Sequence, residues 1–145
     1  MTQVKTVLTS IAGLALASCL ATASPALAET VAFKANLASS AEVPPNDSPA
    51  TGAATITYDT GSKKLTWQGT YSGLSGAPTA GHFHGPAETG KNAGVAVPIT
   101  AASSPFQGSA DLTDAQAADL MAGRWYLNIH TDAHKGGEIR GQVVK

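Results

Sequence analysis

Cysteine is almost absent from this sequence of 145 residues, in which Cys19 is the only one. A single cysteine cannot form a disulfide within the chain, so a folded domain depends on its hydrophobic core for stability. A chain of this length forms one domain with one core of useful size.

The sequence also lacks an excess of either charge, with nine Lys and Arg residues against ten Asp and Glu residues and a formal net charge of -1. Without a basic cluster or an acidic tail, nucleic acids and anionic membrane surfaces are excluded as electrostatic partners. The chain has no Ser-His-Asp order, nucleophile elbow, P-loop or dinucleotide fingerprint. Hydrolase chemistry and nucleotide cofactors therefore have no support, and no catalytic residue can be assigned.

No apolar run is long enough to cross a membrane in the mature protein. Residues 6–17 form a short apolar segment after Lys5, and Ala26-Leu27-Ala28 forms a small-x-small cleavage site. These features predict a signal peptide at residues 1–28, followed by one domain at residues 29–145 that is exported to the periplasm or the exterior. As an alternative, residues 16–19 resemble a lipobox, which would make the protein a lipoprotein anchored at Cys19.

From residue 31 onward, short stretches alternate between apolar and polar residues and are separated by glycine, proline, asparagine and aspartate. This pattern is typical of an all-β sandwich or barrel. Alternation is clearest at residues 31–37, 54–58 and 65–71, and the sequence at 59–62 favours a hairpin turn. Further strands are expected at about residues 79–84, 94–99, 124–131 and 138–144.

One short helix is expected within this β structure. Thr113 and Gln116 have the spacing of a capping box, in which each side chain bonds the backbone of the other residue. The alanine-rich segment that follows favours helix as far as Ala122, and Gly123 supplies a C-terminal stop. We expect this helix to form a lid or crossover on the sandwich.

All four histidines fall in two short segments. Because side chains alternate along a strand, His82 and His84 share one face and Phe83 points into the core. The same rule places His130 on a polar face of the strand at 124–131, and His134 follows in the next turn. The sequence therefore predicts a metal site formed by His82, His84 and His130, with His134 as an optional fourth ligand.

Imidazole ligands without cysteine or methionine suit copper(II) or zinc, and imidazole alone does not choose between them. Glu88, Asp132 and Glu138 lie near these segments and are candidates to fix an imidazole tautomer, although solvated surface charge is the preferred interpretation for Glu88. The alternative is that the histidines only form hydrogen bonds on a polar strand face.

Several of these motifs together resemble the CHRD domain, a family named from chordin and common in bacterial secreted proteins. The resemblance spans about residues 33–144 and rests on these blocks: Glu42-Val43-Pro44-Pro45, Gly52-Ala53-Ala54, His82-Phe83-His84-Gly85-Pro86-Ala87, Leu112-Thr113, Ala122-Gly123, Asn128-Ile129-His130-Thr131 and Gly136-Gly137-Glu138-Ile139-Arg140-Gly141-Gln142. It implies an immunoglobulin-like or superoxide-dismutase-like antiparallel β-sandwich with one short helix. The resemblance is informative about the fold and says little about the activity, because one fold can carry many functions.

A more distant likeness is to the copper/zinc superoxide dismutases, which also carry a His-x-His pair, a later histidine and then an arginine. His82, His84, His130 and Arg140 stand in this order. The likeness implies a copper-only site, because the bridging histidine, the zinc loop and the disulfide cysteines are missing. Arg140 would then offer a cation to an incoming anion, or alternatively would clamp loop carbonyls or a carboxylate such as Glu42.

Three functions follow as expectations. The preferred one is a secreted, non-enzymatic protein that binds a transition metal, copper before zinc. The second is a copper-only enzyme similar to superoxide dismutase. The third is an adhesion module of the cell envelope that binds another protein or a polysaccharide, with structural histidines.

Overall fold

The computed structural model describes residues 28–100 and 102–145. Nearly all of the predicted signal peptide, including Cys19, lies outside the described residues, so the structure does not test the predicted cleavage site or the lipoprotein alternative. None of the helices in the described part of the chain has the length and apolar composition required to span a membrane.

The described chain forms eight strands, one 3-10 turn and one α-helix. In chain order these are β1 (Thr30–Ala38), η1 (Ser39–Ala41), β2 (Thr51–Asp59), β3 (Lys64–Ser72), β4 (Pro78–His84), β5 (Val95–Ile99), β6 (Phe106–Asp111), α1 (Asp114–Met121), β7 (Tyr126–Thr131) and β8 (Ile139–Gln142). The prediction of an all-β antiparallel sandwich with one short helix is confirmed.

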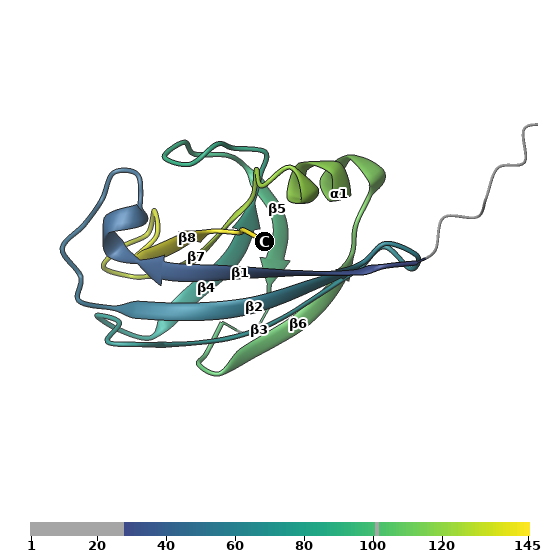
Figure 1. The fold of residues 1–145 in the computed structure, drawn as a ribbon. Helices are drawn as coiled ribbons and strands as arrows, with labels where there is room; N and C mark the ends of the chain where they lie inside the picture. The colour runs from purple at the N-terminus through teal and green to yellow at the C-terminus, as the bar shows by residue number, and fades with distance from the viewer. Residues whose placement is uncertain (1–27, 101) are drawn as a thin grey trace, which may run out of the picture.

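The eight strands form one antiparallel sheet in the order β5-β4-β7-β8-β1-β2-β3-β6, which folds over into two layers (Figure 1). The first layer contains β1, β2, β3 and β6, and the second contains β4, β5, β7 and β8. The two layers are joined through β1 and β8 by few backbone pairs. Ala38 of β1 pairs with Arg140 of β8, and an isolated bridge joins Lys34 to Val144. The folded sheet makes a nearly closed sandwich around one core.

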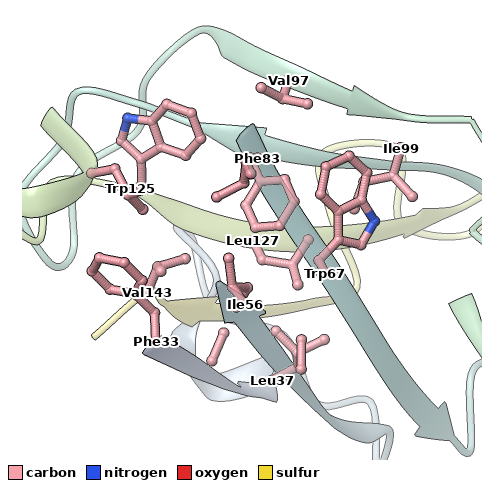
Figure 2. Packing of buried hydrophobic residues seen from close by; sticks show 14 of the residues in the cluster. Phe33, Leu37, Ile56, Trp67, Phe83, Val97, Ile99, Trp125, Leu127 and Val143 are labelled. Atoms are coloured by element: carbon pink, nitrogen blue, oxygen red, sulfur yellow. The ribbon is translucent and has the colours of Figure 1, made fainter. Parts of the chain in front are cut away.

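Apolar residues from both layers meet inside this sandwich, as Figure 2 shows. Trp67 of β3 packs edge-to-face against Phe83 of β4, with ring centroids 5.2 Å apart. Ile56 and Leu127 lie beside this pair and are at most 1% exposed. Burial of each such side chain stabilises the fold by about 2 kcal/mol, which explains how the domain holds without a disulfide.

The helix α1 begins as the sequence predicts. Thr113 accepts a hydrogen bond from the backbone N–H of Gln116, and the Gln116 side chain accepts one from the N–H of Thr113. Gln116 also donates to the carbonyl oxygen of Ala96 at 3.1 Å, and Leu120 is buried. These contacts fasten α1 beside β5.

Two features differ from the sequence prediction. The strand β6 was not predicted, because Phe106 is the buried residue at its start and the rest of the strand alternates only among small and polar residues. The strand β7 is buried along its whole length, although its alternation suggested one open polar face. Loops cover the outer face of β7, and this covered face contains the candidate site.

Candidate metal centre

Two paired strands bring three histidines together. On β4, His82 and His84 point to the outer face of the sheet, while Phe83 is fully buried in the core. On β7, alternation places Asn128 and His130 on that same outer face. The antiparallel register sets His82 opposite Asn128, and His130 occupies the next outer position along β7.

The three imidazoles lie within reach of one ion. Nδ1 of His82 is 3.0 Å from Nε2 of His130. One ligand nitrogen from each of His82, His84 and His130 lies within 4.8 Å of the others. His130 therefore lies beside the His-x-His pair, because β4 and β7 pair with each other. His134 is not part of this group in the described structure.

Backbone carbonyls fix two of the rings in one tautomer. Nδ1 of His84 lies 2.9 Å from the carbonyl oxygen of Ala93, and Nδ1 of His130 lies 3.0 Å from that of Lys135. A carbonyl oxygen only accepts, so each Nδ1 carries the hydrogen and the Nε2 of the neutral ring keeps a free lone pair. Metal-binding histidines are oriented by this kind of hydrogen bond.

Asn128 lies between the two fixed rings and has a role that sequence reasoning missed. Its Oδ1 is 2.9 Å from Nε2 of His130 and 3.1 Å from Nε2 of His84, and the residue is 2% exposed. The sequence could have suggested this role, because Asn128 lies two residues before His130 and therefore on the same strand face. Because lone pairs from both rings and from this oxygen converge, a cation or a proton between them is stabilising.

Burial keeps the histidine pair in the neutral form that binds metals. Burial is the main cause that lowers the pKa of His82 and of His84 below the ordinary value of 6.5, and the charge interaction with His130 lowers the pKa of both further. At neutral pH these imidazoles are therefore unprotonated at one nitrogen and can bind a metal without first losing a proton.

Arg140 fastens a loop over the site. The residue is 2% exposed, and its guanidinium carbon lies 3.4 Å above the ring centre of Tyr126. Nη1 donates to Oδ1 of Asn92 at 2.9 Å, and Nη2 donates to the carbonyl oxygen of Lys91 at 2.6 Å. The loop at 85–94 held in this way also supplies the Ala93 carbonyl to His84. The loop-clamp alternative for Arg140 is confirmed, and the guanidinium is not open to an incoming anion.

Glu42 is a buried carboxyl group behind Asn128. The residue is 5% exposed, and its Oε1 has no hydrogen-bond partner among the described residues. Burial raises the pKa of Glu42 to about 7, although the charge of Arg140 and a hydrogen bond from Asn128 pull the pKa downward. Gly137 has φ +128° and packs so closely on this carboxyl group that any side chain there would overlap it. In the described structure Arg140 bonds the loop and forms no ion pair with Glu42.

Glu138 joins the loops beside the site but does not bond a histidine. It accepts hydrogen bonds from the hydroxyls of Ser48 at 2.6 Å, Ser75 at 2.7 Å and Thr131 at 2.6 Å. Burial would raise the pKa of Glu138, but these hydrogen bonds outweigh it and lower the pKa to about 2. The expectation that a nearby carboxylate fixes an imidazole tautomer is therefore wrong for Glu138, since carbonyls do this.

A family model for the CHRD domain matches residues 33–143. The chain belongs to the CHRD domain family. This match confirms the resemblance carried by the sequence motifs. Neither a curated protein nor a solved structure matches the chain. The CHRD match covers every residue of the candidate metal centre.

Proposed function

We propose that this CHRD-domain protein binds one transition-metal ion, copper(II) in preference to zinc, through His82, His84 and His130, in a role that needs no catalysis. The observation that carries the proposal is the convergence of ligand nitrogens from three histidines, two of which already have their tautomers set. Hydrogen bonds to Ala93 and Lys135 leave the lone pairs on the inward nitrogens of two rings. Such an arrangement lowers the cost of ordering the ligands when a metal binds.

The general order of divalent-metal affinities favours copper, since a site of imidazole nitrogens binds copper(II) more tightly than zinc. Nδ1 of His82 and Nε2 of His130 lie 3.0 Å apart, at hydrogen-bond distance, so these two nitrogens already face each other before a metal binds.

Titration of the metal-free mature protein with copper(II) and then with zinc tests this function. We expect one copper per chain, with nitrogen hyperfine structure in the electron paramagnetic resonance spectrum from directly bound imidazoles. A double change of His82→Ala and His130→Ala removes two of three ligands and should weaken copper binding at least about 100-fold. Unchanged stoichiometry and affinity in this variant would sink the proposal.

His134→Ala is the control variant, because it removes an imidazole that lies outside the proposed ligand set. We expect copper affinity in this variant within about threefold of the wild type, since His134 lies outside the group of three. A loss as large as that of the double variant would make His134 an obligatory ligand and would revise the geometry of the site.

We propose further that the domain acts after export, with residues 1–28 removed. The apolar segment and the Ala26-Leu27-Ala28 motif support this. Intact mass spectrometry of the mature protein should give a chain that begins at Glu29. An acylated chain that begins at Cys19 would replace this proposal with the lipoprotein alternative.

The copper-only enzyme alternative has less support. A superoxide dismutase mechanism needs a cation that attracts the anionic substrate, whereas the guanidinium donors of Arg140 bond Asn92 and Lys91 in the buried clamp. Loss of superoxide catalysed by the fully copper-loaded protein, and abolished by chelation, would reverse this preference.

A further inference from the structure

The layer that contains no histidine has its own polar outer face. On β1, β2, β3 and β6, every second side chain points away from the core. The register aligns Lys34, Thr55, Gln68 and Gln107 in one row across these four strands. Neighbouring strands lie about 4.8 Å apart, so this row spans about 14 Å. It presents four exposed hydrogen-bonding side chains at nearly regular spacing.

Three adjoining hollows follow this face along β2 and β3. The central one has a volume of about 590 Å³ and contains the row just described together with Asn36 and Thr70. A hollow of about 190 Å³ shares Thr55, Gln68 and Gln107 with it. A third, of about 370 Å³, shares Thr70 and Ala53 with it. Because the hollows share residues, together they form one groove, which we call the β2–β3 groove.

The chemistry of the β2–β3 groove is almost free of charge. Lys34 is the single charged residue among those that line the three hollows, and none of them is a carboxylate. The other polar groups are amides and hydroxyls, which both donate and accept hydrogen bonds. A groove without a carboxylate, imidazole or thiolate lacks the ligands that hold most metal ions tightly, and its single positive charge gives little attraction to a polyanion.

The polar side chains of the central hollow are also uncommitted. Six exposed side chains surround it and take part in none of the hydrogen bonds between the described residues: Lys34, Asn36, Thr55, Gln68, Thr70 and Gln107. The buried polar groups on the opposite layer, by contrast, are extensively bonded to one another. A ligand that enters the central hollow can therefore form hydrogen bonds with these side chains without breaking any within the protein.

A protein surface fits this groove less well than a chain of hydroxyl groups does. Protein interfaces have an apolar, often aromatic centre. The large hydrophobic side chains exposed in the described structure are Val95 and Val144, and neither lines the groove. The lining of the central hollow instead combines the apolar residues Ala53, Pro105 and the largely buried Phe106 with the amides and hydroxyls. A sugar ring has apolar C–H surfaces and polar hydroxyl groups. A lining that combines small apolar surfaces with hydrogen-bonding side chains matches both.

The geometry points to a binding site for a neutral polysaccharide in the β2–β3 groove. Amides and hydroxyls in a row at the strand spacing meet the repeated hydroxyls of successive sugar rings, and the lack of carboxylates and the single ammonium suit an uncharged polymer. The site lies on the opposite layer from the histidines and does not depend on the proposed metal function.

Affinity electrophoresis of the mature protein tests this inference. The native gels contain one neutral polymer at a time, hydroxyethylcellulose, laminarin, soluble starch or galactomannan, and one further gel contains the anionic polymer alginate. We expect at least one neutral polymer to slow migration and alginate to have no greater effect. The double change Gln68→Ala and Gln107→Ala removes two exposed amides and should raise the dissociation constant at least about tenfold, the equivalent of one lost net hydrogen bond.

Two controls make the result decisive. His82→Ala with His130→Ala leaves the groove intact, so it should keep the wild-type retardation. Thr55→Arg fills the groove from an exposed position and should abolish it, while circular dichroism verifies the fold of each variant. No retardation by any neutral polymer, stronger retardation by alginate, or retardation unaffected by the groove variants would overturn the inference. A concentration-dependent dimer in sedimentation velocity that is lost in Thr55→Arg would also overturn it, by assigning the groove to a second copy of the chain.

Discussion

The two outer faces of the sandwich use polar residues in opposite ways. On the layer of β4, β7 and β8, loops cover the polar side chains, which bond one another closely: Arg140 holds the loop at 85–94 and Glu138 holds three hydroxyls. On the layer of β1, β2, β3 and β6, the six polar side chains around the central hollow of the β2–β3 groove are exposed and form no hydrogen bond with the described residues. Strand alternation alone predicts a polar face for both layers. The difference is whether a loop folds over that face.

Among the variants proposed, Arg140→Ala should have the largest effect on stability, because Arg140 holds the loop that covers one of the two faces. The change removes two hydrogen bonds and the contact with the Tyr126 ring, and it leaves the buried Glu42 without the favourable charge of Arg140. We expect the free energy of unfolding to fall by about 3 kcal/mol, measured by urea denaturation of the metal-free protein. A loss below about 1 kcal/mol would mean that the loop does not depend on this clamp.

Glu138→Gln should weaken the same covered face by about 2 kcal/mol at pH 7, because hydroxyl donors lose a charged acceptor. The native pKa of Glu138 is about 2, below the ordinary 4.5. Its stabilising contribution is therefore complete above pH 4.5 and is lost as the pH falls towards 2. Urea denaturation between pH 2.5 and pH 7 should show a steeper acid loss in the wild type than in Glu138→Gln. If the unfolding free energies of the two proteins change with pH in parallel, the acid-sensitive stability does not come from the Glu138 carboxylate.

Asn128→Ala tests whether the covered face is organised around a metal. Removing the amide takes away the group that lies between His84 and His130, so both rings lose a fixed neighbour. We expect copper affinity to fall about tenfold, as for other residues that orient metal ligands. Isothermal titration calorimetry measures this, and Asn92→Ala is the control amide, since it bonds Arg140 and no histidine. An equal loss of copper affinity in both variants would mean that the effect comes from the loop at 85–94 and not from the contact of Asn128 with the histidines.

Glu42→Gln should shift the pH dependence in the opposite sense to Glu138→Gln, with an effect of about 1 kcal/mol after allowance for partial solvent screening. Because the native pKa of Glu42 is about 7 and the ordinary value is 4.5, the folded state keeps a proton that the unfolded chain loses. Wild-type stability therefore falls as the pH rises from 4.5 through 7. We expect the variant to be more stable than the wild type at pH 8 and similar at pH 4, measured by urea denaturation without metal. A variant less stable at pH 8 would refute this.

The smallest effect on stability is expected in the β2–β3 groove. Gln68→Ala and Gln107→Ala remove exposed side chains that bond nothing in the described structure. The free energy of unfolding should change by less than about 0.5 kcal/mol. Thermal unfolding followed by circular dichroism checks this. A larger loss would show that the groove is a structural surface like the opposite face.

The sequence predicted most strands and placed His82 with His84, and His130, on polar strand faces, because alternation fixes which side chains of one strand share a face. It missed β6, where a single large apolar residue gave too weak a pattern. It placed Asn128 on the correct face without a role, because the distance between His130 and the His-x-His pair depends on the register of β4 with β7. The carbonyls of Ala93 and Lys135 were equally beyond prediction, since any residue supplies a carbonyl oxygen.

Local chemistry in the sequence by itself determined most of the β strands, the helix cap at Thr113, the inward position of Phe83 and the shared face of His82 and His84. Alternation and capping act over a few residues, so they can be inferred from sequence. The tertiary structure alone decided that loops cover one polar face and leave the other open. That outcome depends on long-range contacts, such as Arg140 with Lys91 and Glu138 with Ser48, which join segments far apart in the chain.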